Sequence, residues 1–273
     1  MSALPEPRTA AGAAALAEVL AEPARAVVAV DFDGTLAPIV PRPEDARPAP
    51  GAIAALAALA DCVGRCAVVT GRAALEAVRL GGLTDVRRLE VLGHYGLQRW
   101  SDGRLSSPDP LPQIAAARQR LGEVVAAAPE GVHLEDKEHS LVVHTRPAAD
   151  PAGALASLAP AVETVAAELD LETVPGRFVL EVRPRGVDKG LAVRSLSDER
   201  DAHVVVYVGD DLGDLPAFDA IEELRRNGRL GLTVASAGGD APPDLADRAD
   251  LVVEGPIAVV AFLEALAAAI GQP

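Results

Sequence analysis

The stretch VAVDFDGTLAPIV, residues 28–40, is an apolar run that leads into two carboxylates, Asp31 and Asp33, and then breaks at Gly34. Such a run is typical of a buried strand in a parallel sheet. Ligands of open parallel sheets bind beyond the carboxyl ends of the strands, so Asp31 is predicted to face a cleft. There it can attack phosphorus as a nucleophile, while Asp33 protonates the leaving oxygen and later deprotonates a water molecule. An isolated acid pair is more often a simple turn, so other segments must decide.

The composition is that of a folded, acidic protein. The 273 residues are 49% hydrophobic, and 40 acidic against 25 basic side chains give a net charge of −15. This charge disfavours nucleic acid and anionic membranes as partners. Residues 1–25 contain charged side chains that argue against a signal peptide or membrane span, so we expect a cytoplasmic protein. We also expect it to be a monomer. The two cysteines, Cys62 and Cys66, are expected to be ordinary thiols.

Apolar strands alternate with Ala/Leu-rich helices over most of the chain, which predicts a parallel sheet covered on both faces. The predicted strands are 26–32, 66–70, 89–92, 203–208, 230–235 and 250–253, and the predicted helices are 50–61, 72–80, 190–199, 215–226 and 256–270. The apolar stretch 10–20 is compatible with either a docking helix or a frayed tail.

A different pattern begins near residue 108. It predicts two repeats of a helix followed by two strands, over 113–128, 131–136, 140–146, 151–169, 171–174 and 177–183. Proline and glycine punctuate the flanking stretches 106–112 and 183–188, which we interpret as hinges. The predicted organisation is a discontinuous core of residues 1–107 and 184–273, with an inserted α+β domain of residues 108–183.

Three further segments place reactive groups at the ends of core elements. Thr70 ends a strand before Gly-Arg, Lys189 opens a helix, and Asp210, Asp211 and Asp214 follow another strand. Each has an ordinary alternative: a threonine cap, a surface lysine and an acidic turn. Together they suit a phosphate site, with a hydroxyl and a cation for phosphoryl oxygens and hard oxygen ligands for Mg²⁺.

This ordered set resembles the haloacid dehalogenase superfamily of phosphohydrolases, whose four motifs match DFDGT at 31–35, Thr70, Lys189 and GDD at 209–211. The resemblance implies a Rossmann-like core with an inserted cap of type C2B. It also implies that Asp31 forms an aspartyl-phosphate, that Asp33 is the general acid and base, and that Thr70 and Lys189 bind the phosphoryl group.

The same resemblance implies a Mg²⁺ site. Its ligands would be the Asp31 carboxylate, the Asp33 carbonyl and Asp210, with Asp211 or Asp214 assisting through water.

Within the superfamily the chain is most similar to trehalose-6-phosphate phosphatases. Their patterns appear as DFDGTLAPI, the Gly-Arg after Thr70, GVHLEDKEHSLVVHTR at 131–146 and EVRPRGVDKG at 181–190. The resemblance implies that substrate is bound by Arg72, His94, Glu135, Lys137, His144, Arg146 and Glu181. Period two places Glu135 and Lys137 on one strand face, and His144 and Arg146 on one face of the next. For the four hairpin residues the structural alternatives are a solvated face or cross-strand pairing. For Arg72 the alternative is an ion pair with an acid, and Glu181 has a corresponding ion-pair alternative.

Two segments depart from the family pattern. GHYGLQRW at 93–100 replaces the usual Gly-Ser-His-Gly, and GDDLGDLPAF at 209–218 keeps Asp214 but lacks the usual Thr and Glu. These changes leave the residues for phosphoryl transfer in place, and they bear on how the leaving group is recognised.

We therefore predict a Mg²⁺-dependent phosphatase that hydrolyses trehalose 6-phosphate. The alternatives are a phosphatase of another disaccharide or sugar phosphate, a non-catalytic sugar-phosphate-binding regulatory domain, and a phosphoryl-transferring mutase, for which nothing indicates the bisphosphate activator.

Overall fold

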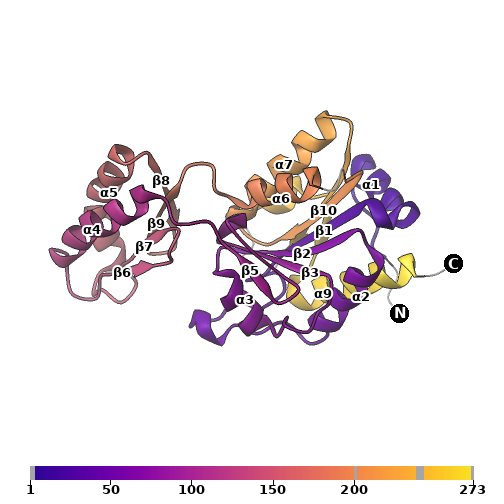
Figure 1. Ribbon diagram of the computed structural model, residues 1–273, viewed down its shortest axis with the longest axis horizontal. Helices are drawn as coiled ribbons and strands as arrows, with labels where there is room; N and C mark the ends of the chain where they lie inside the picture. The colour runs from indigo at the N-terminus through magenta and orange to yellow at the C-terminus, as the bar shows by residue number, and fades with distance from the viewer. Residues whose placement is uncertain (1–3, 200–201, 238–242, 272–273) are drawn as a thin grey trace. The chain divides into compact units, whose positions relative to one another are not determined.

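The computed structural model describes residues 4–199, 202–237 and 243–271. The chain divides into two compact units, Met1–Ser107 with Asp188–Pro273, and Pro108–Val187 (Figure 1). We call them the core unit and the cap unit. The cap unit extends four residues beyond the expected boundary at residue 183, because its last strand reaches Pro184 and the Val187 amide donates to the Pro184 carbonyl (3.4 Å).

The core unit contains an eight-stranded sheet in the order β12-β11-β10-β1-β2-β3-β4-β5. Neighbouring strands from β12 to β3 are parallel, whereas β4 and β5 are antiparallel. The bounds are β1 (Ala26–Asp31), β2 (Arg65–Val69), β3 (Leu89–Gly93), β4 (Gln98–Ser101), β5 (Arg104–Ser106), β10 (Val204–Gly209), β11 (Leu230–Ser236) and β12 (Leu251–Val253). The predicted α/β class is confirmed.

Helices cover both faces of this sheet (Figure 1). Side chains alternate along β1: Val28 and Val30 join the core with α1 (Ala10–Ala21), α2 (Ala52–Cys62), α3 (Ala74–Gly81) and α9 (Gly255–Ile270). Val27 and Ala29 pack with α6 (Lys189–Asp198), α7 (Leu215–Arg226) and α8 (Pro243–Arg248). The strand is apolar on both faces because both faces are buried.

The stretch 10–20, which the sequence left open, lies in the packed helix α1. Leu16 and Val19 are buried in the core. The Thr9 hydroxyl accepts from the Gly12 amide (2.9 Å) as the N-cap, and the Arg8 amide donates to the Asp250 carbonyl (2.6 Å). The helix is therefore an integral part of the core unit.

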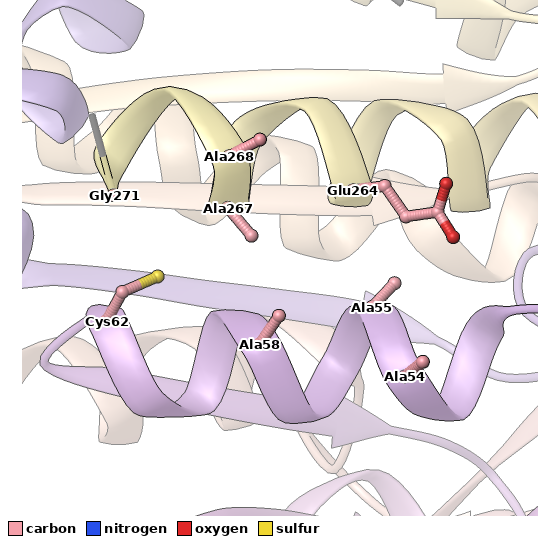
Figure 2. A pocket seen from close by; sticks show the side chains of 8 residues that line it. All are labelled: Ala54, Ala55, Ala58, Cys62, Glu264, Ala267, Ala268 and Gly271. Carbon is pink, nitrogen blue, oxygen red and sulfur yellow. The ribbon is translucent and has the colours of Figure 1, made fainter. Parts of the chain in front are cut away.

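Helices α2 and α9 lie side by side along rows of small residues. Between them lies a groove of about 400 Å³. Figure 2 shows its lining residues, Ala54, Ala55, Ala58, Cys62, Glu264, Ala267, Ala268 and Gly271. None of the predicted site residues lines it. Of the helices in the described part of the chain, none combines the length and apolarity needed to cross a membrane.

The hairpin of β4 and β5 was not predicted from the sequence. Asp102 and Gly103 join the strands with φ values of 48° and 76°. An Asp-Gly pair in this conformation is a common two-residue hairpin turn. It places Trp100 in the core, where it is 3% exposed.

The cap unit is a four-stranded antiparallel sheet in the order β6-β7-β9-β8. Its elements are α4 (Pro112–Ala126), β6 (His133–Asp136), β7 (Leu141–His144), α5 (Pro151–Glu168), β8 (Leu171–Gly176) and β9 (Val179–Pro184), in the expected order. Leu141, Val143, Leu180 and Val182 pack against Ile114, Leu121 and Val162 of the helices. The opposite side of the sheet therefore carries the alternate residues, among them Glu135, Val142, His144 and Glu181.

Candidate active site

The core residues predicted from sequence meet at the carboxyl ends of three neighbouring strands. Asp31 ends β1, Thr70 follows β2 and Asp210 follows β10, and β1 lies between the other two. Lys189 is the first residue of α6, whose N-cap Asp188 accepts from the Leu191 amide (2.8 Å). The parallel topology thus gathers residues that are far apart in the sequence.

Lys189 is buried between two carboxylates. Its Nζ lies 2.7 Å from Oδ1 of Asp31 and 2.7 Å from Oδ1 of Asp214. Burial alone would lower the pKa of Lys189, but Asp214 and Asp31 outweigh it and hold that pKa well above its ordinary value. The side chain is therefore a fixed ammonium beside Asp31.

Asp214 is the structural centre of this cluster and is 0% exposed. Besides Lys189, its Oδ1 accepts from the Tyr207 hydroxyl (2.6 Å), and its Oδ2 accepts from the amides of Asp210 (2.9 Å) and Asp211 (3.1 Å). Burial would raise the pKa of Asp214, but Lys189 and these donors lower it. Tyr207 was missed because a tyrosine within an apolar strand gives no signal of a polar role.

Three carboxylates share one ammonium at this point. One oxygen each from Asp31, Asp210 and Asp214 lie within 4.8 Å of one another. Burial raises the pKa of Asp31 well above its ordinary value against the opposing effect of Lys189, and burial and the Asp214 charge raise that of Asp210 to about 7. Excess buried negative charge on hard oxygen ligands fits a divalent cation such as Mg²⁺. Because both Asp214 oxygens already accept hydrogen bonds, Asp31 and Asp210 are the carboxylates suited to hold it directly.

The turn after β1 is shaped around Asp210. The Thr35 hydroxyl donates to Oδ1 of Asp210 (3.0 Å). Gly34 has φ +86°, and a Cβ there would lie 1.8 Å from Oδ2 of Asp210. The Ser236 hydroxyl donates to the Gly34 carbonyl (3.0 Å) from β11. Only glycine combines this backbone conformation with so close an approach.

Asp33 is bound to Arg72. The guanidinium donates from Nε (2.6 Å) and Nη2 (2.7 Å) to the two Asp33 oxygens, and Nη1 donates to Glu76 (3.1 Å). The Arg72 amide donates to the Thr70 hydroxyl (3.2 Å), which ties this pair to the loop after β2. Of the two roles left open for Arg72, the structure shows the ion pair with an acid.

His94 and Tyr95 lie in the short helix η3 (His94–Gly96) after β3. His94 is buried, with 4% exposed, and its contact with substrate stays a prediction. Tyr95, which together with His94 departs from the family pattern, is partly exposed and lies against Gly71.

The cap unit brings three of its predicted residues together. His144 Nε2 lies 2.8 Å and Lys137 Nζ lies 3.9 Å from Glu135 Oε2, and His133 stacks on His144 with ring centroids 4.8 Å apart. The contact with His144 is the main reason that the pKa of Glu135 is lowered. Arg146 is separate from this cluster and donates to the Arg177 carbonyl (3.4 Å).

Glu181 lies on the same side of the cap sheet as Glu135, because Val142 pairs with both. It is 8% exposed, and its carboxylate accepts from the Ser140 hydroxyl (2.6 Å). Ser140 was not among the predicted residues.

Comparison with known proteins gives a consistent result. A family model described as trehalose-phosphatase matches residues 29–249. The trehalose-phosphate phosphatase of Mycobacterium marinum is 36% identical over 213 residues, 72% of this chain and 52% of the relative. That of Mycolicibacterium paratuberculosis is 33% identical over 252 residues, 87% of this chain and 61% of the relative. The chain thus spans little more than half the length of these relatives.

A solved structure shows the same fold. The C-terminal domain of Candida albicans trehalose-6-phosphate phosphatase superimposes with a TM-score of 0.72 at 22% identity, covering 98% of this chain and 99% of the other.

Proposed function

Because the chain belongs to the trehalose-phosphatase family, we propose that it hydrolyses trehalose 6-phosphate to trehalose and phosphate. The observation that carries this proposal is the buried Lys189 ammonium, 2.7 Å from the carboxylate at the end of β1. Phosphoryl transfer depends on positioning and on neutralising the charge of the phosphoryl group. A fixed cation beside a carboxylate nucleophile supplies both.

In the first step an Asp31 oxygen attacks phosphorus, and an Asp31–phosphate bond forms as the bond from phosphorus to the sugar oxygen breaks. Asp33 gives its proton to that oxygen, so trehalose leaves as a neutral alcohol. In the second step Asp33 takes a proton from water, whose oxygen attacks phosphorus and releases the Asp31 carboxylate and phosphate. Lys189 and the Thr70 hydroxyl hold phosphoryl oxygens throughout.

Mg²⁺ is the proposed metal, held by Asp31, the Asp33 carbonyl and Asp210. When bound, it supplies positive charge that offsets the repulsion between the Asp31 carboxylate and a phosphate dianion. Asp214 supports these residues indirectly, because it accepts hydrogen bonds from Lys189 and from the amides of Asp210 and Asp211 and so holds them in place. Asp211 caps the turn by accepting from the Gly213 amide (2.8 Å).

Arg72 holds Asp33 without using up its capacity to carry a proton. Each Asp33 oxygen accepts one hydrogen bond from Arg72, and a carboxylate oxygen has a second lone pair that can take a proton. We propose that Arg72 sets the resting position of Asp33 between turnovers.

We further propose that the cap unit recognises the sugar. Glu135, Lys137 and His144 together offer hydrogen-bond acceptors and donors within one polar cluster, which suits sugar hydroxyls. Glu181 lies on β9 of the same sheet, and Arg146 lies two residues after the end of the neighbouring strand β7. A binding role predicts that changes at these residues alter KM for the sugar phosphate and spare a small aryl phosphate.

The test is a substrate panel. Phosphate release is measured from trehalose 6-phosphate, sucrose 6-phosphate, glucose 6-phosphate and an aryl phosphate, with Mg²⁺ and with chelator. The proposal requires selective, metal-dependent release from trehalose 6-phosphate. Preference for another sugar phosphate would refute trehalose 6-phosphate as the substrate but would leave the proposed phosphatase mechanism standing. No release from any of the four would favour a binding domain.

A further inference from the structure

The loop after β3 is held against the loop that carries Thr70. The Tyr95 amide donates to the Thr70 carbonyl (3.0 Å), and the His94 amide donates to the Arg72 carbonyl (2.8 Å). The Thr70 amide in turn donates to the Leu92 carbonyl (2.9 Å) of β3. We call residues 70–72 the phosphate loop. Its backbone is thus bonded to η3 and to the end of β3.

The backbone of η3 is strained at two consecutive residues. His94 has φ 45° and Tyr95 has φ 59° and ψ 26°, in the left-handed region. Within residues 4–199, 202–237 and 243–271, these are the only adjacent non-glycine residues with positive φ. Such conformations persist only when surrounding contacts enforce them, and they concentrate at functional sites.

In this conformation the Tyr95 ring lies close to Gly71. A Cβ on Gly71 would lie 2.8 Å from the Tyr95 hydroxyl oxygen, 2.9 Å from Cζ and 3.0 Å from Cε1. The outer edge of the ring therefore covers the middle residue of the phosphate loop. Thr70, whose hydroxyl is proposed to hold a phosphoryl oxygen, is the residue directly before it.

η3 also touches the helix that carries Lys189. A Cβ on Gly96 would lie 3.2 Å from the Ala192 Cβ of α6. The loop thus lies against both elements that supply phosphate-binding groups. Its position can fix the spacing of the Thr70 hydroxyl from the Lys189 ammonium.

We propose that Tyr95 is a positioning residue. Its ring holds the phosphate loop in place, and thereby keeps the Thr70 hydroxyl correctly positioned relative to Asp31. This inference rests on the proposed role of Asp31 and Thr70 in phosphoryl transfer, and it is independent of which sugar leaves. The hydroxyl oxygen and the ring atoms Cζ and Cε1 all lie near Gly71, and we assign the role to the ring, which Tyr95→Phe retains.

The experiment compares four variants with the wild type: Tyr95→Phe, Tyr95→Asn, Gly71→Ala and the double variant Gly71→Ala/Tyr95→Asn. Asparagine tolerates the left-handed conformation, so Tyr95→Asn removes the ring without adding backbone strain. The readouts are kcat and KM for trehalose 6-phosphate and an aryl phosphate, and the inhibition constant of orthovanadate, which reports on the phosphoryl site. Near-ultraviolet circular dichroism verifies folding.

We expect Tyr95→Phe to retain kcat within about twofold, because the ring remains. Tyr95→Asn and Gly71→Ala each lower kcat for both substrates by at least ~10-fold and weaken vanadate inhibition, because small displacements in an active site are costly. The double variant is no worse than the worse single variant, since the added methyl group and the ring no longer collide.

Three results would overturn the proposal: unchanged kcat and vanadate inhibition in folded Tyr95→Asn, a loss in Tyr95→Phe as large as in Tyr95→Asn, or multiplied losses in the double variant. If Tyr95→Asn does not fold, Tyr95→Phe and Gly71→Ala decide. A wild type that hydrolyses none of the phosphate esters would refute the proposed function, whereas an active wild type with unaffected variants would refute the role of Tyr95 alone.

Discussion

Replacing Asp214 with asparagine should destabilise the core unit severely. The buried carboxylate accepts four hydrogen bonds, from Lys189, Tyr207 and the amides of Asp210 and Asp211. An amide group keeps the volume but has only one acceptor oxygen, so two of the four donors lose their acceptor. The Lys189 ammonium also loses one of its two negatively charged neighbours.

The magnitude follows from these contacts. Hydrogen bonds that involve a charged group contribute about 1.5–3 kcal/mol each, and breaking a buried ion pair from one side costs about 3–5 kcal/mol. Asp31 remains as a counter-ion for Lys189, so we expect a loss near the lower end, about 3 kcal/mol in the free energy of unfolding.

The assay is equilibrium unfolding in urea followed by the fluorescence of Trp100. This is the single tryptophan of the chain, and it is buried in β4 of the core unit. With a urea dependence of about 2–3 kcal/mol per molar, the loss lowers the midpoint by about 1–1.5 M. The matched control is Asp219→Asn, because Asp219 is exposed and pairs with Arg248 on the surface (2.6 Å). That variant should lose under about 1 kcal/mol.

A second measurement separates the shared contacts. Tyr207→Phe removes one donor to Asp214, so its effect and that of Asp214→Asn should sum to more than the loss in the double variant. Equal midpoints for Asp214→Asn and the Asp219 control would refute the assignment of Asp214 as the centre of the cluster.

Three further predictions concern other parts of the chain. Arg99 is the main reason that the pKa of Glu199 is lowered from 4.5 to about 2. The stability that this ion pair contributes is present above pH 4.5 and is lost as the pH falls toward 2. Glu199→Gln should therefore flatten the acid dependence of the urea midpoint, and an unchanged slope would contradict the prediction. Gly34→Ala forces a methyl group onto Asp210 at φ +86° and should cost about 1–3 kcal/mol of stability and raise the Mg²⁺ concentration needed for activity; wild-type metal dependence would exclude the clash. Lys137→Ala should raise KM for trehalose 6-phosphate by about tenfold and leave aryl phosphate hydrolysis within about twofold; equal effects on both substrates would argue against sugar recognition.

The core strands could be predicted because burial on both faces of the sheet requires a nearly continuous run of apolar residues. β1 is apolar up to its last residue, Asp31, and β10 is apolar apart from Tyr207 and is followed directly by Asp210. Parallel topology then requires that the strand ends meet, so Asp31, Thr70 and Asp210 could be brought together without coordinates.

The partners of these residues could not be predicted in the same way. The ion pair of Asp33 with Arg72 and the contact of Tyr207 with Asp214 depend on side-chain directions that spacing does not encode. The hairpin turn at Asp102 did carry a signal, the following glycine, which the sequence analysis overlooked. Helix α1 was ambiguous because an alanine-rich segment has similar polarity whether packed or exposed.

The proposed mechanism requires that Asp31 becomes phosphorylated during turnover. The most direct measurement is rapid acid quenching of the enzyme with Mg²⁺ and trehalose 6-phosphate carrying a labelled phosphoryl group, followed by detection of label on the protein, in the wild type and in Asp31→Asn. We expect hydroxylamine-labile label at Asp31 in the wild type, and neither label nor turnover in the variant. Turnover in folded Asp31→Asn, or label on another residue, would contradict it.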